Sequence, residues 1–481
     1  MIVPDVIADL DRQHADPGSS PLHRQIYERI AAAVLDGRLT PGARLPSSRS
    51  LAAQLSVARG TVDAAYQQLA GEGYVVTRGA AGTRIDPALD ARTPRPAPAA
   101  EPAGAAGLPT ASPPPGLFQG GLPALDAFPR KTWARLAARE ARALGRADLA
   151  YQPPRGDERL RIQTARHLAI ARGIHCRPGE VMITGGFQGA LGLAVRTLLK
   201  PSAAVWVEDP GYRPGRNAIR LAGARPVGVP VDGEGFDVTR AGSDRAPASM
   251  ALVTPTHQFP LGMSMSLQRR MALLQWAASA GGWIVEDDYD SEFRYEGRPI
   301  PALKSLDRCE RVLYAGTFSK VLAPGLRVGY LVLPPGLVER FAEVARLLQP
   351  PPSALVQATI AAFMERGDLA RHIRRMRALY ARRRAAVAEA LMDQGAAGLR
   401  IELQPGGMHL VARLPSGTDD VGLAARLADD GIAVHPLSAC HVESAGEPGL
   451  LIGFTNVETE RAPNAARRLR AAIERAQAGG A

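Results

Sequence analysis

The sequence predicts an α/β protein of two unlike units, a small helical unit that ends in a hairpin and a large unit built on a mostly parallel sheet. Three observations predict this architecture. At 481 residues the chain is longer than one domain of about 100–200 residues. Residues 87–116 contain nine prolines and nine alanines but no aromatic residue. Beyond them, short apolar runs alternate with helical stretches, as in sheets covered by helices on both faces.

The composition excludes several classes of protein. Apolar residues make up 46% of the chain, and the net charge of +11 favours a polyanionic partner without proving one. The three cysteines (Cys176, Cys309 and Cys440) exclude a disulfide scaffold and lie too far apart for a zinc cluster. No metal site is predicted. The first ten residues lack a basic run, and no apolar run approaches the ~18 residues of a membrane span, so we expect a cytoplasmic protein without a membrane partner.

The small unit, predicted to span residues 19–87, should contain three helices and a hairpin. Residues 21–35 place apolar side chains at helical spacing, and a serine at 47 or 48 can cap a short second helix. Residues 59–70 form the third helix, and YVVTRGAAGTRI alternates on both sides of a glycine-rich turn. This order of elements describes a winged helix-turn-helix.

Such a unit would place its third helix in the major groove of double-stranded DNA. Residues 21–85 carry eight arginines against four acidic residues, a net charge of +4, which has the sign that DNA requires. A protein-binding helical module with a solvated arginine face is the alternative. The residues predicted to contact DNA are Ser47, Arg49, Arg59, Thr61, Arg78 and Gly82.

The run from Pro21 to Ile85 resembles the DNA-binding domain of GntR-type bacterial repressors. The matching stretches are PLHRQIYERI, DGRLTPGARLPSSRSLAAQL, TVDAAYQQLAGEGYV and AAGTRI. That family commonly has Ser-Arg-Asn where this chain has Ala58-Arg59-Gly60. An asparagine contact in the groove is therefore missing, and Gly60 should weaken the start of the helix.

Residues 88–117 are predicted to be a Pro/Ala-rich linker, because so few apolar side chains cannot bury a core. The large unit then covers residues 118–475. Its apolar runs, expected to be strands, are 181–184, 204–208, 251–254, 283–286, 311–315 and 329–333. Ligands of such sheets bind beyond the carboxyl ends of the strands.

Polar residues follow three of these predicted strands. Gly185-Gly186-Phe187-Gln188 opens a helix after the first, where backbone N–H groups and the helix dipole favour a phosphate. Asp287-Asp288-Tyr289-Asp290 follows the run 283–286. Gly316-Thr317-Phe318-Ser319-Lys320 follows the run 311–315, with Arg327 seven residues later. The other three lysines, Lys131, Lys200 and Lys304, are predicted to be ordinary surface residues.

This combination suits pyridoxal 5'-phosphate. A lysine forms a Schiff base with the aldehyde, and a carboxylate keeps the pyridine nitrogen protonated. A phenol can bond the ring oxygen, hydroxyls and an arginine can bind the phosphate, and Tyr212 can stack on the ring. Taken alone, Asp287 could be a helix cap and Arg327 a surface cation.

Residues 118–475 resemble the fold-type I aminotransferases, on the runs YQPPRGDERLRIQTARHLAIARGI, ITGGFQGAL, VEDPGY, TPTHQFPLG, VEDDYDSEFRY and GTFSKVLAPGLRVGY. The resemblance implies a mostly parallel seven-stranded sheet and a smaller α/β C-terminal subdomain. It implies that Lys320 carries the Schiff base, Asp287 pairs with the ring nitrogen and Tyr289 with the ring hydroxyl. Phosphate positions fall on Gly186, Phe187, Gln188, Thr317, Ser319 and Arg327, and His257-Gln258 lie where the enzymes have Asn-Pro beside the ring.

Both units in this order resemble the MocR subfamily of GntR-type regulators. The resemblance implies a transcription regulator whose cofactor, alone or joined to an amino compound, is the effector. It also implies a head-to-tail homodimer and target genes of vitamin B6 or amino-compound metabolism.

An active aminotransferase with a fused DNA-binding domain is the alternative function. Such an enzyme needs an arginine for the substrate carboxylate, and residues 449–457 contain none, so Arg213 and Arg216 are the candidate substitutes. A DNA-binding scaffold with an inactive cofactor site is a third reading, which the intact set of Asp287, Tyr289 and Lys320 disfavours. The arginine-rich residues 371–384 are predicted to form an amphipathic helix with a solvated face, and a second DNA-touching surface is the alternative.

Overall fold

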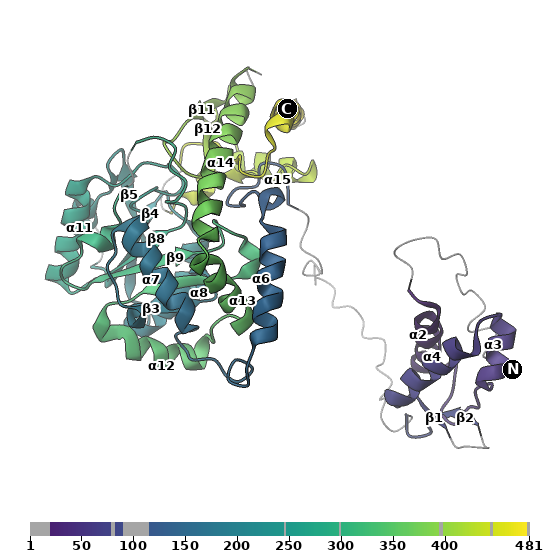
Figure 1. Cartoon of the computed structure of the whole chain (residues 1–481). Coiled ribbons are helices and arrows are strands. Elements are labelled where there is room, and N and C mark those ends of the chain that lie inside the picture. The colour runs from purple at the N-terminus through teal and green to yellow at the C-terminus, as the bar shows by residue number, and fades with distance from the viewer. Residues whose placement is uncertain are drawn as a thin grey trace. The chain divides into compact units, whose positions relative to one another are not determined.

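The computed structural model describes residues 20–77, 82–89, 115–244, 247–297, 300–393, 398–442 and 446–478. These residues form two compact units, which divide between residues 112 and 113 (Figure 1). We call them the head and the body and describe each by itself. Most of the predicted linker lies outside the described residues.

The head has the predicted order of elements. Its helices are α2 (Leu22–Leu35), α3 (Ser48–Leu55) and α4 (Arg59–Gly71), followed by the antiparallel hairpin of β1 (Val75–Thr77) and β2 (Thr83–Ile85). Ser47 is the N-cap of α3, because its side chain accepts a hydrogen bond from the backbone N–H of Ser50 at 3.1 Å. Helix α4 begins at Arg59 although Ala58 offers no capping side chain and Gly60 follows.

Helix α4 packs against both other helices of the head, so a single core holds the unit together. Ile30, Leu51, Val62 and Leu69 are fully buried in this core. Ile85 of the hairpin joins them, which fixes the hairpin to the helices. The helix, helix-turn-helix and hairpin order of a winged helix is therefore confirmed.

The body is built on one mixed sheet. Its strands are β3 (Val181–Thr184), β4 (Ala204–Asp209), β5 (Arg225–Asp232), β6 (Gly235–Phe236), β7 (Met250–Val253), β8 (Trp283–Asp288), β9 (Val312–Thr317) and β10 (Gly329–Val332). They lie in the order β3-β10-β9-β8-β7-β4-β5-β6. Strand β10 is antiparallel to both neighbours, β5 pairs with β6 in an antiparallel manner, and the remaining pairs are parallel. The two-residue strand β6 adds an eighth strand to the seven expected.

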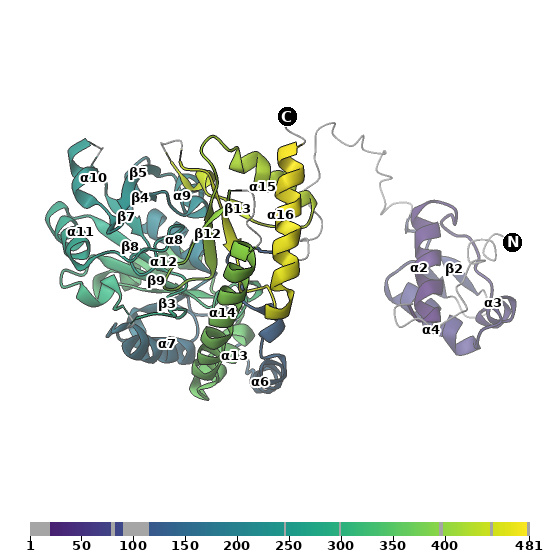
Figure 2. The same cartoon turned by 90° about the horizontal axis from the view of Figure 1, so that it is seen from above.

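Helices cover both faces of this sheet (Figures 1 and 2). Alternation along β3 shows the two faces, because Val181 and Ile183 pack in the core beside α7 (Glu158–Arg172), whereas Met182 packs in the core beside α8 (Phe187–Leu198). Helices α9 (Arg213–Leu221) and α12 (Val338–Leu348) lie with α8, and α10 (Val238–Asp244) lies with α11 (Leu267–Ala280). The predicted three-layer α/β architecture is confirmed.

A second, four-stranded antiparallel sheet forms the smaller subdomain. Its strands are β11 (Arg400–Glu402), β12 (His409–Arg413), β13 (His435–Pro436) and β14 (Gly449–Gly453), in the order β11-β12-β14-β13. Its helices α14 (Asp368–Asp393) and α16 (Ala462–Ala478) lie side by side, as Figure 2 shows. The remaining helices are α6 (Arg130–Ala143), α13 (Ala354–Glu365) and α15 (Asp420–Asp429), with short 3-10 turns at Leu125–Ala127, Pro178–Glu180, Leu303–Leu306, Pro324–Leu326, Pro335–Leu337, Ser438–Cys440 and Thr459–Arg461.

Helix α14 contains the arginine-rich segment and is amphipathic, as predicted. Ile373, Met376 and Tyr380 are buried against the core. Arg383 departs from the expected solvated face, because it is buried and donates to Asp126 and to the backbone oxygen of Thr455 at 2.6 Å. None of the helices in the described part of the chain is long and apolar enough to cross a membrane.

Candidate functional site

A cavity of about 310 Å³ lies at the carboxyl ends of the body's central strands. Residues from α8, from the ends of β8 and β9 and from the smaller subdomain line it together. Ten of the twelve residues predicted to bind a cofactor line this cavity: Gly186, Phe187, Gln188, Tyr212, Asp287, Tyr289, Thr317, Ser319, Lys320 and Arg327.

Lys320 presents a buried amine to the cavity. Its Nζ donates a hydrogen bond to the backbone oxygen of Gly121 at 2.7 Å. Gly121 has φ +73°, a backbone conformation that favours glycine, and a Cβ at this position would lie 2.7 Å from Nζ and displace the amine. Burial lowers the pKa of Lys320, although the nearby Asp290 and Asp287 partly oppose this shift. Desolvation thus favours the neutral amine, which is the nucleophilic form.

Successive side chains of a strand point to opposite faces of the sheet, and this alternation divides the acidic residues at the end of β8 between the two faces. Glu286 accepts hydrogen bonds from the backbone N–H groups of Leu303 and Lys304, at 2.8 and 2.7 Å. Asp288 forms a buried ion pair with Arg172 at 2.7 Å. Only Asp287 and Tyr289, on the opposite side of the strand, line the cavity.

Asp287 is the buried carboxylate of the cavity. Burial and the neighbouring Asp288 raise its pKa well above the ordinary value, while Lys320 opposes the shift. Within the described part of the chain, no donor forms a hydrogen bond to this carboxylate. The carboxylate therefore suits a cationic partner inside the cavity.

One end of the cavity forms a cradle for an anion. Gly186 precedes α8 with φ +89°, a conformation that favours glycine and exposes the first N–H groups of a twelve-residue helix. The Arg327 guanidinium approaches within 3.8 Å of where a Cβ of Gly186 would be, and donates to the backbone oxygen of Gly185 at 3.4 Å. The Thr317 hydroxyl accepts from the N–H of Ser319 at 3.1 Å, which shapes the turn beside them.

Tyr212 forms an aromatic wall of the cavity. Its ring contacts that of Phe259 edge to face, with centroids 5.5 Å apart, and that of Phe187 at 6.1 Å. Burial raises the pKa of Tyr212 to about 12, so its phenol stays neutral. A flat ligand in the cavity would meet this ring.

His257 and Gln258, the other two predicted residues, do not line the cavity. Gln258 is buried in its own loop, where its amide donates to the backbone oxygen of Pro210 at 2.8 Å and accepts from the N–H of Leu261 at 3.0 Å. His257 lies behind Tyr289, with Nδ1 2.9 Å from the Tyr289 hydroxyl. The sequence predicts that both residues lie beside the ring of the cofactor. In the structure their hydrogen bonds hold them behind the residues that line the cavity.

Sequence reasoning missed the residues that close the cavity from outside the main sheet. These come from the start of the body, from the loop after β7 and from the smaller subdomain: Gly120, Gly121, Phe259, Met408, His409, His435 and Leu451. Paired glycines at 120–121 were the one available signal. Lys304 also departs from its prediction, because it is half-buried and paired with Asp307 at 3.0 Å.

Neither candidate substitute for a carboxylate-binding arginine reaches the cavity. Arg216 is buried and donates to the backbone oxygens of Cys440 and Ala439, the latter at 3.0 Å. Arg213 is exposed at the start of α9 and does not line the cavity. Among the described lining residues, Arg327 in the anion cradle is the sole arginine.

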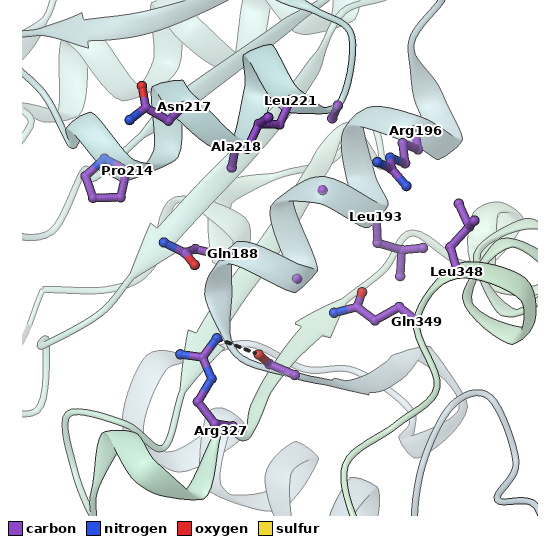
Figure 3. A pocket seen from close by; sticks show the side chains of 14 residues that line it. Gln188, Leu193, Arg196, Pro214, Asn217, Ala218, Leu221, Arg327, Leu348 and Gln349 are labelled. Atoms are coloured by element: carbon purple, nitrogen blue, oxygen red, sulfur yellow. Dashed lines mark hydrogen bonds between the residues drawn. The ribbon is translucent and has the colours of Figure 1, made fainter. Parts of the chain in front are cut away.

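A wider groove of about 570 Å³ lies between α8, α9 and the end of α12. Figure 3 shows Arg327 at one end of it, with its hydrogen bond to Gly185 drawn, and Gln349 beside α8. Arg327 and Gln188 line both this groove and the cavity, so the anion cradle is reached from both sides.

In the head, the predicted DNA-contacting residues lie mostly at helix starts. Arg49 and Arg59 are exposed on α3 and α4, and Arg59 pairs with Asp63 at 3.4 Å. The Ser47 side chain caps α3, and Thr61 is half-buried in the first turn of α4. Gly82 begins the return of the hairpin with φ +80°, and Arg78 lies outside the described residues.

Arg44 is an exposed arginine that the prediction missed. Its guanidinium lies over Gly82, 3.4 Å from where a Cβ of that glycine would be. Residue 44 also forms a β-bridge with Arg84 of the hairpin. The side chain of Arg44 therefore adds a positive charge beside the hairpin, which is the wing.

Comparison with known proteins covers both units. The family of bacterial regulatory proteins of the gntR type matches residues 22–85, and aminotransferase class I and II matches residues 124–469. The probable rhizopine catabolism regulatory protein MocR of Rhizobium meliloti is 36% identical, covering 96% of this chain and 95% of that protein. The pyridoxine biosynthesis regulator PdxR of Corynebacterium glutamicum is 37% identical, covering 91% and 92%.

Solved structures resemble the body. The α-aminoadipate aminotransferase LysN of Thermus thermophilus, complexed with N-(5'-phosphopyridoxyl)-L-leucine, is 30% identical with a TM-score of 0.69, covering 75% of this chain and 92% of that one. The kynurenine aminotransferase of Pyrococcus horikoshii gives a TM-score of 0.67 at 30% identity, covering 74% and 90%. With a gntR-type head joined to an aminotransferase-type body, and relatives matched over nearly their full length, this chain belongs to the MocR-type family of helix-turn-helix transcription regulators.

Proposed function

We propose that this regulator binds pyridoxal 5'-phosphate at Lys320 and that occupancy of the body cavity controls binding of the head to an operator. The observation that carries the proposal is the convergence of a buried amine, an unpaired buried carboxylate and an anion cradle in one cavity. These three features match the aldehyde, the ring nitrogen and the phosphate of one molecule.

The residues present fit this cofactor. The Asp287 carboxylate would pair with the protonated ring nitrogen, which would remove the unfavourable isolation that now raises its pKa. Tyr289 would donate to the ring oxygen and Tyr212 would stack on the ring. Gly186, Phe187, Gln188, Thr317, Ser319 and Arg327 would hold the phosphate. When bound, the cofactor supplies an aldehyde that exchanges between primary amines.

Control of transcription requires that the ligand bind two states of the protein unequally. The residues that line the cavity come from the sheet, from the start of the body and from the smaller subdomain. A cofactor bound there would therefore change how these three parts pack together. We propose that the protein is a head-to-tail homodimer, that residues 88–117 act as a tether between units 19–87 and 118–475, and that Arg49, Arg59, Thr61 and the wing residues Arg78 and Gly82 contact the operator.

The name of one relative suggests which genes are regulated. PdxR is named for regulation of pyridoxine biosynthesis, and TauR of Rhodobacter capsulatus, 35% identical over 88% of this chain, is another helix-turn-helix regulator. We propose that this chain regulates vitamin B6 or amino-compound metabolism genes in the cytoplasm, with the cofactor or its amino-compound adduct as effector.

Two measurements test the proposal. Purified protein should show the visible absorbance of a lysine-linked cofactor, and Lys320→Ala should abolish that absorbance. Mobility shifts on the promoter of the protein's own gene should change when pyridoxal phosphate is added to the wild type but not to Lys320→Ala. A colourless protein whose DNA binding ignores the cofactor would contradict the proposal.

An aminotransferase with a fused DNA-binding head is the second candidate, since the same cavity residues serve that chemistry. The absence of a second arginine among the described lining residues weighs against it. Incubation with amino donors and a keto acid should therefore give negligible turnover, and rapid, steady amino-acid formation would favour the enzyme.

A further inference from the structure

His257 is a buried histidine held between a phenol hydroxyl and a carboxylate behind the cavity wall. Its Nδ1 lies 2.9 Å from the Tyr289 hydroxyl and 3.1 Å from Oδ2 of Asp290. The side chains of His257 and Asp290 are 8% and 1% exposed, so water does not compete for these contacts. Tyr289 alone of the three lines the cavity.

The contact with Asp290 favours one tautomer of His257. A carboxylate without a proton only accepts, and opposite such a carboxylate Nδ1 of His257 carries the hydrogen that lies between them. That same N–H is also directed at the Tyr289 oxygen, which then acts as an acceptor. The Tyr289 O–H is left free to donate in another direction, and the cavity is the direction that the residue lines.

Packing fixes the histidine ring in this position. Gly407 has φ +90°, and a Cβ there would collide with the His257 ring. The Gly407 backbone is held by a hydrogen bond from the Tyr295 hydroxyl at 2.6 Å and by one to the Phe293 oxygen at 2.9 Å. The Nε2 atom of His257 is buried without a hydrogen-bond partner in the described part of the chain, so the ring's orientation depends on Nδ1.

We propose that Asp290 and His257 form a positioning relay that holds the Tyr289 hydroxyl as a donor to the cofactor's ring oxygen, and so lowers the proton affinity of the nitrogen joining the cofactor to Lys320. This inference rests on the proposed function. A donor stabilises negative charge on the ring oxygen, and the oxygen then attracts the proton of the neighbouring nitrogen less strongly.

Other titratable groups surround the relay and are present in every variant. Burial raises the pKa of Glu208 to about 7, so Glu208 titrates in all variants and the midpoints are compared between variants. The groups that act on Tyr289, Lys320 or the nearby His409 are Glu208, Asp287, Asp288 and His435. Burial, with Asp290 and Asp287, raises the pKa of Tyr289 well above its ordinary value, so its hydroxyl keeps its proton throughout neutral pH.

The test is a pH titration of visible absorbance on the full-length chain loaded with pyridoxal phosphate. His257→Leu removes the relay and should raise the titration midpoint by about one pH unit, a tenfold increase in proton affinity. His257→Asn is the matched variant, because its side-chain amide nitrogen takes the place of Nδ1, and it should keep the midpoint close to that of the wild type. Tyr289→Phe should raise the midpoint at least as much as His257→Leu.

A double-variant cycle separates the relay from a general structural effect. In the Tyr289→Phe background, His257→Leu should add no further shift, whereas an additive shift would overturn the relay. An unchanged midpoint in His257→Leu would overturn it too. If the leucine variant does not take up cofactor, His257→Gln, whose amide reaches the Nε2 position instead, is titrated under the same criterion. A wild type without any visible absorbance would contradict the proposed function itself, not the relay.

Discussion

The cavity of the body and the DNA-facing surface of the head are assembled in opposite ways. The cavity collects residues from positions 120 to 451, and some of them are hydrogen-bonded to distant segments, as Lys320 is to Gly121. The head offers exposed arginines whose partners lie within the same helix, such as Arg59 and Asp63. The charge and orientation of a buried side chain depend on contacts made by the whole fold. The position of an exposed arginine depends only on the helix that carries it.

The largest expected difference between the two units concerns ion pairs of nearly equal length. Arg172 lies 2.7 Å from Asp288 with both side chains almost fully buried, whereas Arg24 lies 2.8 Å from Glu28 in the head with both exposed. Arg172→Met should lower the free energy of unfolding of the body by about 3–5 kcal/mol, because it removes the counter-charge of a buried carboxylate, to which the Tyr314 hydroxyl still donates at 2.6 Å.

Tryptophan fluorescence during urea unfolding measures this change, since all four tryptophans (Trp133, Trp206, Trp276 and Trp283) belong to the body. Arg24→Met is the matched control and should leave the stability of the head unchanged within error, as measured by hydrogen exchange of the head's helical amides, because the head contains no tryptophan. Similar losses in both units would remove the contrast between them.

The second prediction concerns the cavity's buried carboxylate. Asp287→Asn should weaken pyridoxal phosphate binding by about 10- to 100-fold, because a charge-assisted hydrogen bond to the ring nitrogen contributes about 1.5–3 kcal/mol. Equilibrium titration of visible absorbance gives the dissociation constant. The control is Asp429→Asn on the exposed side of α15, which should bind as the wild type does. If Asp287→Asn bound pyridoxal phosphate as tightly as the wild type, the ring nitrogen would not be paired with Asp287.

The third prediction addresses the head. Arg59→Ala should weaken operator binding by about tenfold and reduce the slope of log affinity against log salt by about one, because one phosphate-facing charge is lost. Mobility shifts at several salt concentrations measure both quantities. Arg24→Ala, on α2 rather than the reading helix, serves as the reference variant. Unchanged binding by Arg59→Ala would contradict the winged-helix orientation.

The smallest expected effect tests two glycines of the head. Gly60 lies in the first turn of α4 with no atom within 4 Å of a Cβ placed there, so Gly60→Ala should stabilise the head by about 0.5–1 kcal/mol. Gly82 has φ +80°, and Gly82→Ala should destabilise it instead. Hydrogen exchange of the α4 amides measures both, and equal effects would show that backbone conformation is not the cause.

Sequence reasoning located the parts of the site that are local to a strand end. Asp287, Tyr289 and Lys320 were predicted because each lies within five residues of the end of an apolar run, and the structure brings them into one cavity. Strand β5 was missed because Pro226 and Pro230 interrupt its pattern, which a strand near the sheet edge tolerates.

The rest depends on contacts between segments far apart in the chain. Gly121, His409 and His435 reach the cavity only because the smaller subdomain and the start of the body fold over the sheet. Nothing in the spacing of their neighbours indicates this. Gln258 shows the converse, since its position in the sequence does not reveal that its amide is hydrogen-bonded within its own loop and does not line the cavity.

The hydrogen bond from Lys320 to Gly121 joins the buried end of the Lys320 side chain to the first described stretch of the body. Phe118 of that stretch is fully buried, and the backbone N–H of Leu117 bonds to the oxygen of Gly431 at 3.0 Å. A covalent bond formed by the Lys320 amine would therefore change the hydrogen bond that it donates to Gly121. The amine proposed to bind the cofactor is thus one hydrogen bond away from the segment with which the described body begins.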